Sequence, residues 1–391
     1  MDKKAADMMA PIVGAKPEEV VLMQTLTANL HLLMCAFYKP EMEGRHKIIL
    51  ESKAFPSDHV SKPGKTWFVK TNEEQYAVES QILMHGLNPS ESMICIEPPA
   101  NQDPSNRLLG TDYIKSIIDQ HAADTAVLLL PGIQFYSGEL FDIKTITAYA
   151  QSKGIFCIWD LAHAAGNVPL QLHDWNVDAA AWCSYKYINA GPGAIGGLFV
   201  HERNSKRSED GKIVNRLSGW WGQDKVTRFK MVNSFQPMEG AKGFQISNPS
   251  AIDLTSLCAS LEVYGLTSMD KLREKSLRLT KYLEDLLNDL KSKGGQFIQL
   301  TPTDPERRGA QLSLKLEPGL LAVVMHELED RAVILDERKP DVIRVAPAPL
   351  YNNYTDVWKF MEAFKRALVV AQGAKDGNGA AQGDESMLQT S

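Results

Sequence analysis

The chain has little of what marks several protein classes. Among 391 residues there are only five cysteines, each alone in apolar surroundings, so no disulfide framework is indicated. No apolar run is long enough to cross a membrane, and the charged N-terminal residues do not resemble a secretion signal. The formal net charge is -6 without a basic stripe, which disfavours nucleic acids and anionic membranes as partners. We therefore expect a reduced, soluble, cytoplasmic protein that acts on small molecules.

What the chain does have is apolar sequence, 44% of its residues, which is enough to bury a large core. From Val20 to Val200, short apolar runs alternate with helical patterns, as in mostly parallel sheets whose strands alternate with helices. Because the runs are almost wholly hydrophobic, we expect strands that are buried on both faces. The runs are Val20–Met23, Ile48–Leu50, Met93–Ile96, Ala126–Leu130, Ile155–Trp159 and Ala179–Trp182.

A different pattern begins at Asn248. A long charged helix with a stripe of leucines ends near Gly294, and strand and helix patterns follow it. We predict a large domain over residues 1–247, a small α+β domain over 248–372 and a disordered tail over 373–391, which lacks apolar anchors. The expected fold class is α/β, a three-layer sandwich around a mostly parallel sheet, with the small α+β domain at the C-terminal end.

Charged residues stand at the ends of two of the apolar runs. Asp160 ends the run Ile155–Trp159, His163 follows three residues later, and Lys186 comes soon after Ala179–Trp182. In open parallel sheets the ligand crevice lies outside the carboxyl ends of the strands, so both charges should reach one crevice. The plainer alternatives are a helix-capping Asp160 and an exposed Lys186.

Together these residue types match one cofactor. Pyridoxal phosphate needs a lysine for its aldehyde, a carboxylate for its pyridine nitrogen, an aromatic or imidazole over its ring and an anion pocket for its phosphate. The chain offers Lys186, Asp160, His163 or Phe55, and a helix that starts near Thr27. A helix start with threonines is a ready anion site, although an ordinary cap is the simpler interpretation of that segment alone.

Two other motifs are weighed as rivals. Gly191–Gly196 has the letters of the dinucleotide-binding fingerprint, but the residues after it have a strand pattern where the fingerprint needs a helix. We expect these glycines to form a tight turn. Because His59, His163 and His173 have no Cys or His at ligand spacing, we expect no metal site.

From about Gly14 to about Val370 the chain resembles the kynureninases, pyridoxal-phosphate hydrolases of the aspartate-aminotransferase fold. The resemblance rests on seven segments, namely Leu26–His31, Ala54–His59, Asp160–His163, Ser184–Gly191, Gly219–Gly222, Ile246–Pro249 and Ile343–Pro347. It implies that Lys186 binds the coenzyme and that Tyr185 contacts the phosphate and assists proton transfer. It further implies that Arg344 binds the substrate's α-carboxylate.

The resemblance also implies which other residues hold the coenzyme. The phosphate, ring and pyridine contacts within one subunit would be Leu26, Thr27, Phe55, Pro56, Ser57, Asp58, Asp160 and His163. Trp220 and Asn248 would complete the site from the partner subunit of a homodimer.

The implied reaction is hydrolysis of L-kynurenine, or of 3-hydroxy-L-kynurenine, to an anthranilate and L-alanine, in tryptophan catabolism and NAD biosynthesis. One alternative is another enzyme of the same fold, such as a cysteine desulfurase or lyase, which would need a mobile reactive cysteine. A second is a catalytically impaired kynureninase, because the chain begins after the point where the family's N-terminal segment would have passed.

Val60–Gln75 interrupts the resemblance between His59 and Tyr76. We interpret it as an insertion, which is either a solvated lysine-rich loop or a retained intron. Its first and last codons can contain donor-like and acceptor-like sequences. The block follows a predicted cofactor loop directly and could perturb it.

Overall fold

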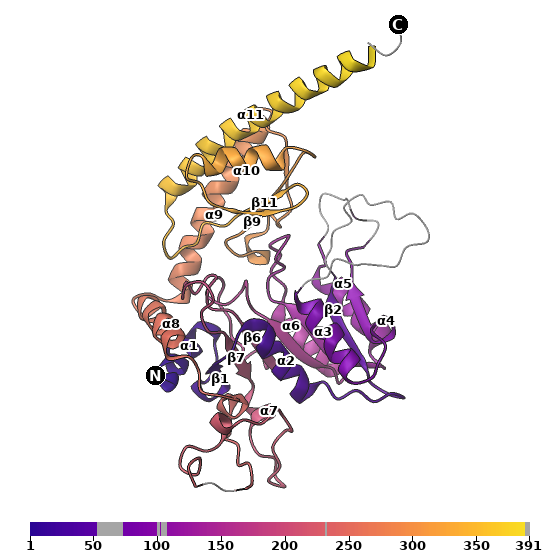
Figure 1. Ribbon diagram of the computed structural model, residues 1–391, viewed down its shortest axis with the longest axis vertical. Coiled ribbons are helices and arrows are strands. Elements are labelled where there is room, and N and C mark those ends of the chain that lie inside the picture. The colour runs from indigo at the N-terminus through magenta and orange to yellow at the C-terminus, as the bar shows by residue number, and fades with distance from the viewer. Residues whose placement is uncertain (53–72, 100–101, 103–107, 231–232, 388–391) are drawn as a thin grey trace. The chain divides into compact units, whose positions relative to one another are not determined.

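The computed structural model describes residues 1–52, 73–99, 102, 108–230 and 233–387, and it divides into two compact units (Figure 1). Among the described residues, the first unit comprises 1–52, 73–99, 102, 108–134, 140–230 and 233–270. The second comprises residues 135–139 and 271–387.

A seven-stranded sheet forms the core of the first unit, with the order β1-β7-β6-β5-β4-β2-β3. Neighbouring strands from β3 to β6 pair in parallel, whereas β7 is antiparallel to both β6 and β1. The carboxyl ends of all strands except β7 therefore lie along one edge. The strands are β1 (Val20–Leu22), β2 (Lys47–Glu51), β3 (Met93–Ile96), β4 (Thr125–Pro131), β5 (Phe156–Asp160), β6 (Ala179–Trp182) and β7 (Gly197–Val200).

Helices cover both faces of this sheet, which confirms the three-layer α/β fold. On one face α2 (Leu26–Phe37) packs against β5, β6 and β7, and Ile158 joins its apolar cluster. The next residue, Trp159, faces α6 (Ile143–Ser152) on the other side, where its Nε1 donates to Thr147 Oγ1 at 2.9 Å. Burial on both faces explains why the strands are almost wholly apolar.

The remaining helices of the first unit are short to medium in length. They are α1 (Asp2–Val13), α3 (Glu73–Met84), α4 (Pro89–Ser92), α5 (Thr111–His121), α7 (Glu202–Ser205) and α8 (Ala251–Tyr264), with the 3-10 turns η1 (Pro17–Glu19), η2 (Trp220–Gly222) and η3 (Ala241–Phe244). Within the described residues, every helix of the chain is too short or too polar to cross a membrane.

A four-stranded antiparallel sheet, ordered β10-β11-β9-β8, forms the second unit together with long helices. One face of β9 and β11 packs Leu312, Leu314 and Ile343 against the helices, as the alternating pattern predicts. The elements are α9 (Met269–Ser292), β8 (Phe297–Gln299), η4 (Pro305–Arg307), β9 (Leu312–Leu316), α10 (Leu321–Glu329), β10 (Asp336–Arg338), β11 (Val342–Val345) and α11 (Tyr354–Met387).

Two expected boundaries differ from the structure. The change of unit falls between Asp270 and Lys271 rather than at Asn248, because α8 packs with α1 of the first unit. Helix α11 also continues to Met387, whereas the sequence predicts disorder from Gly373. No proline interrupts this stretch, so the hydrogen-bond ladder that begins in the packed part of α11 can propagate.

Candidate active site

Three predicted site segments follow the carboxyl ends of strands and so meet at one edge of the large sheet. Helix α2 begins at Leu26 just after β1, and Thr25 caps it without a side-chain hydrogen bond. Asp160 is the last residue of β5, and Lys186 follows β6 by four residues. Free backbone N–H groups at a helix start attract anions, so this edge offers an anion pocket, a carboxylate and an amine.

Asp160 lies deep in this edge, with only 4% of its surface exposed. It pairs in register with Pro131 of β4 and Ala181 of β6. Its Oδ1 accepts a hydrogen bond from the backbone N–H of Ala162 at 2.7 Å. The capping alternative is wrong in that β5 is followed by a turn rather than a helix, but this bond ties Asp160 to that turn, in which His163 is half-buried.

Cys183, a buried thiol, follows the end of β6 and lies between Asp160 and Lys186 in the chain. Burial raises the pKa of this thiol, Lys186 lowers it and Asp160 raises it. Asp160 pairs with Ala181 of β6, the strand that leads to Lys186, so both residues stand at the carboxyl ends of neighbouring parallel strands. Lys186 Nζ also lies 5.7 Å from the centre of the Tyr185 ring, and Tyr185 itself is 43% exposed. The paired strands β5 and β6 thus carry the two residues on which the cofactor prediction depends to the same edge of the sheet.

The segment that contains Lys186 is held from outside by α8. Ser256, Ser260 and Tyr264 stand one turn apart on this helix, and their hydroxyls donate to three successive parts of the segment: the carbonyls of Ala190, Ile188 and Tyr187 respectively. Sequence reasoning missed this ladder, because hydroxyls at every fourth position do not reveal which loop they meet.

The glycine-rich segment Gly191–Gly196, which follows the lysine segment, forms a turn, as predicted. Ser184 Oγ donates to the carbonyl of Ile195 at 2.6 Å across it, and Gly191 and Gly193 have positive φ angles of 93° and 74°. Strand β7 comes next, where a dinucleotide fingerprint would need a helix. Gly197 must lack a side chain, since a Cβ there would lie 2.2 Å from the ring of Trp182.

Trp220 and Asn248 lie in neighbouring exposed loops. The backbone at Gly219 touches Ile246 so closely that a Cβ would come within 2.0 Å of the Ile246 oxygen. Trp220 is 51% exposed, and Asn248 is exposed as well. Arg228 supports this loop from within, because its guanidinium lies 4.2 Å from the Trp221 ring and donates to the Trp221 carbonyl at 2.6 Å.

Arg344 belongs to the second unit and lies on the face of the small sheet opposite its apolar core. Its Nη1 donates to the Phe135 carbonyl at 2.8 Å, and its Nη2 pairs with Asp336. Other predicted site residues, Phe55 to Asp58, lie outside the described residues. The same holds for residues 60–72 of the predicted insertion.

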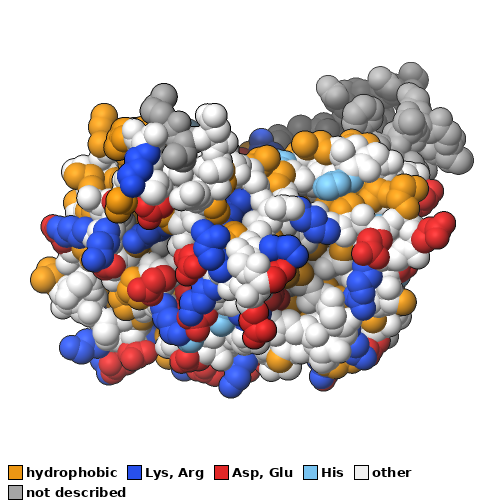
Figure 2. All heavy atoms as spheres, turned by 90° about the horizontal axis from the view of Figure 1, so that it is seen from below, with side chains coloured by type: hydrophobic (Ala, Val, Ile, Leu, Met, Phe, Trp, Pro, Cys, Tyr) orange, Lys and Arg blue, Asp and Glu red, His pale blue; other side chains and the backbone are white. Residues whose placement is uncertain are grey.

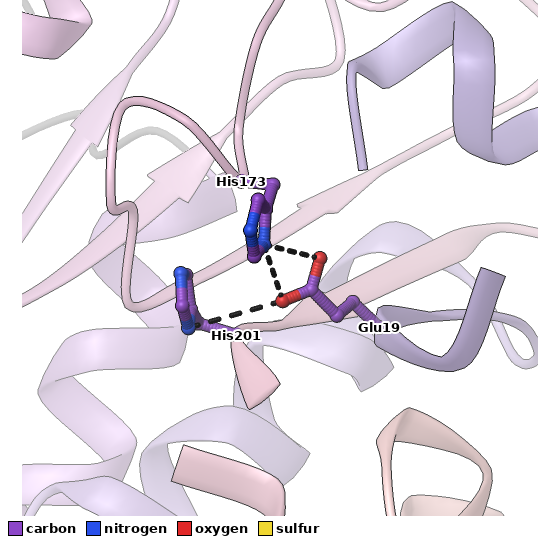
Figure 3. A group of neighbouring side chains, drawn as sticks. All are labelled: Glu19, His173 and His201. Atoms are coloured by element: carbon purple, nitrogen blue, oxygen red, sulfur yellow. Dashed lines mark hydrogen bonds and ion pairs between the residues drawn. The ribbon is translucent and has the colours of Figure 1, made fainter. Parts of the chain in front are cut away.

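Glu19, His173 and His201 form a cluster that sequence spacing did not reveal (Figure 3). His173 Nδ1 lies 2.9 Å from Glu19 Oε1, which also accepts the backbone N–H of Glu202 at 2.9 Å. The two imidazole rings are stacked, with centres 4.9 Å apart and planes 13° apart. A nitrogen lone pair lies in its ring plane, so two stacked rings cannot both point at one ion. The cluster is thus a set of polar contacts that joins η1, the end of β7 and the loop after Leu172.

Solved structures of two other enzymes share the fold of this chain, which gives its fold class. A cysteine desulfurase from Thermococcus onnurineus NA1 matches with a TM-score of 0.70 and 14% identity, over 94% of this chain and 83% of its own. A mutant of the lyase C-DES, with glycine covalently linked to its PLP cofactor, also matches with a TM-score of 0.70, at 16% identity over 93% of this chain and 84% of its own. At such identities the likeness shows the fold alone, which is that of these enzymes.

Sequence relatives narrow the class to one family. A family profile described as the kynureninase C-terminal domain matches residues 272–364. Kynureninase 1 of Chaetomium globosum is 56% identical over 95% of this chain and 74% of its own length. Kynureninase 2 of Neurospora crassa is 56% identical over 95% of this chain and 76% of its own. The chain belongs to the kynureninase family.

Proposed function

We propose that the chain is a pyridoxal-phosphate-dependent kynureninase that hydrolyses L-kynurenine or 3-hydroxy-L-kynurenine to L-alanine and the corresponding anthranilate. The observation that supports this most is that Asp160 and Lys186 follow the carboxyl ends of the paired parallel strands β5 and β6, at one edge of the sheet. Membership of the kynureninase family supplies the substrate class.

The groups present at this edge fit the coenzyme. The amine of Lys186 suits its aldehyde, the fixed carboxylate of Asp160 suits a protonated ring nitrogen, and the start of α2 with Thr27 suits its phosphate. His163 follows Asp160 in the same turn and would pack near the ring. When bound, the coenzyme withdraws electrons from the substrate's α-carbon.

The side chains then divide the remaining work. Once the substrate amine has taken its place on the coenzyme, the amine of Lys186 is a base. It can remove the proton from the substrate's α-carbon and donate that proton to a different atom. Asp160 would face the ring nitrogen, and the backbone N–H of Ala162 orients its carboxylate. Tyr185, exposed beside Lys186, would contact the phosphate and assist proton transfer. Arg344 would bind the substrate's α-carboxylate through its planar guanidinium.

A homodimer with shared sites belongs to the same proposal. The loop around Trp220 exposes Val226 and Phe229, each 77% exposed, which forms an apolar surface of the kind that subunit contacts cover. Trp220 and Asn248 would reach the partner's site from this surface.

On the face drawn in Figure 2, acidic and basic side chains are interspersed over the described residues, and this offers no single-sign patch to a nucleic acid. All five cysteines are free thiols, as expected in the cytoplasm.

Desulfurase chemistry is the weaker alternative, although the solved neighbours include a desulfurase. Such chemistry needs a reactive, low-pKa thiol. Here Cys157, Cys183 and Cys258 are buried, and burial raises the pKa of Cys95 to about 11 and that of Cys157 well above its usual range. Thiols in these positions are poor nucleophiles.

The test supplies the protein with pyridoxal phosphate and L-kynurenine and follows anthranilate fluorescence. Lys186→Ala should abolish both turnover and the visible absorbance of the lysine-bound coenzyme. Lys153→Ala is the matched control, because Lys153 precedes β5 and so lies toward the opposite edge of the sheet. Retained turnover in Lys186→Ala would refute the proposal. A coloured wild-type protein that releases no anthranilate would instead indicate a catalytically impaired member, and sulfide release from cysteine would indicate a desulfurase.

A further inference from the structure

Three charged residues share one face of the small sheet. Asp336 on β10 stands directly opposite Arg344 on β11 in the antiparallel register, and Arg338 follows two residues later on the same face of β10. Asp336 Oδ2 pairs with Nη2 of Arg344, while its Oδ1 accepts from Nη1 of Arg338 at 2.6 Å. One carboxylate therefore bridges two guanidinium groups.

A short backbone segment holds the other side of Arg344. Its Nη1 donates to the Phe135 carbonyl at 2.8 Å, and Gln311 Nε2 donates to the same oxygen at 3.0 Å. Ser313, which pairs with Arg344 across β9 and β11, donates to the next carbonyl, that of Tyr136. The guanidinium is thus fixed at both of its η nitrogens, by a backbone carbonyl and by Asp336.

The Arg344 and Asp336 side chains differ in how much of their surface is exposed. The Arg344 side chain is only 10% exposed, whereas that of Asp336 is 45% exposed. The carboxylate lies at the open rim of the face and the guanidinium beneath it. Asp336 therefore contacts Arg344 from the more exposed part of this face.

We propose that Asp336 is a positioning residue: it orients the Arg344 guanidinium for the substrate's carboxylate, and Arg338 holds Asp336 in place. This inference rests on the proposed function, in which Arg344 binds that carboxylate. Arginine recognises carboxylates through a planar fork, so the orientation of the fork decides how well both oxygens are met. A long side chain that is already oriented loses less freedom when the ligand binds.

The opposite role, a carboxylate that competes with the ligand for Arg344, is less consistent with the contacts. Arg338 binds the same carboxylate from the other side, and its guanidinium lies 5.8 Å from the Phe135 ring. Two guanidinium groups and one carboxylate leave the trio with a net charge of +1. Asp336 thus fixes the fork without cancelling the positive charge that attracts an anion.

The experiment compares two ligands that differ only in the group that Arg344 would bind. L-Alanine has the carboxylate, and L-alaninamide has an uncharged amide in its place, while both have the amine that reacts with the coenzyme. Their binding to the pyridoxal-phosphate-loaded protein is followed by the change in coenzyme absorbance. In Asp336→Ala the dissociation constant of L-alanine should rise about fivefold, equivalent to about 1 kcal/mol, and that of L-alaninamide less than twofold.

Three further variants make the result specific. Asp336→Asn keeps the size and one oxygen acceptor, so it should give a smaller rise, and it replaces Asp336→Ala if that variant does not fold. Arg338→Met should shift L-alanine in the same direction. Glu317→Ala removes a similarly exposed carboxylate from its pair with Lys375 and should change neither ligand. With L-kynurenine as substrate, Asp336→Ala should raise KM and leave kcat nearly unchanged.

Two results would overturn the inference. One is unchanged or tighter L-alanine binding in Asp336→Ala, which would make Asp336 a bystander or a competing anion. The other is an equal loss for both ligands, which would mean general damage to the fold. Because the ligand comparison needs no turnover, it stays informative even if the wild-type protein releases no anthranilate, an outcome that refutes the proposed reaction instead.

Discussion

Replacing Ser260 by alanine should loosen the segment that contains Lys186. The Ser260 hydroxyl is buried and donates to the carbonyl of Ile188, a residue with no exposed surface. Alanine would leave that carbonyl without this donor, and an unsatisfied buried polar group costs about 1–3 kcal/mol. We expect the free energy of unfolding to fall by about that amount. The segment should keep its course, because Tyr264 still donates to Tyr187 on its other side.

The functional consequence should exceed what the stability change alone produces. Ile188 is two residues from Lys186, so the loss of the hydrogen bond to its carbonyl should let the Lys186 amine move away from its catalytic position. Small displacements of a reacting group lower kcat strongly. The assay is urea unfolding together with kcat for L-kynurenine at a temperature where each variant is fully folded. Thr255→Ala is the control on the same helix, because the Thr255 hydroxyl is exposed and donates to the Ala251 carbonyl within α8 and to the Met1 sulfur, not to the lysine segment.

The reasoning fails if Ser260→Ala unfolds at the same urea concentration as the wild type and has the same kcat. It also fails if Thr255→Ala matches Ser260→Ala in both measurements. The lysine segment would then be held by its own turns, and the hydroxyls of α8 would be incidental.

Much of the first unit could be predicted from sequence, for a physical reason. Strands buried on both faces must be apolar along their whole length, so each one stands out from its surroundings. A charge at or just after the end of such a run is then conspicuous, which is why the sequence predicts Asp160 and Lys186 as site residues. The direction of parallel strands does the rest, since it brings their carboxyl ends to one edge.

The missed features depend on contacts that no local pattern contains. Helix α8 was assigned to the small domain because its sequence shows only that it is a helix, not which core it meets. Strand β10 consists of Asp336, Glu337 and Arg338, which have no apolar alternation, so nothing predicted that Asp336 would face Arg344. In both cases the partner is known only once distant segments are paired.

Three further predictions concern stability and assembly. Arg308→Met should lower the free energy of unfolding in urea by about 3–5 kcal/mol, because Glu284 then stays buried without the Arg308 guanidinium that binds both of its oxygens, at 2.7 and 2.9 Å. The double variant Arg308→Met/Glu284→Leu should recover most of this loss. Equal stability of the single and double variants would contradict the prediction. Burial and a neighbouring arginine lower the pKa of His201, so its contribution to stability is present above about pH 6.5 and is lost as pH falls through the folded-state pKa. The free energy of unfolding should therefore fall more steeply from pH 6.5 to 5.5 in the wild type than in His201→Asn, and equal slopes would exclude this histidine as the cause. Gly219→Ala should reduce both turnover and dimer formation, measured by size-exclusion chromatography, because the added Cβ would lie 2.0 Å from a backbone oxygen and must displace the Trp220 loop. Gly373→Ala is the control and should change neither, because Gly373 lies in open space on α11. A dimer that survives Gly219→Ala would show that this loop does not form the subunit contact.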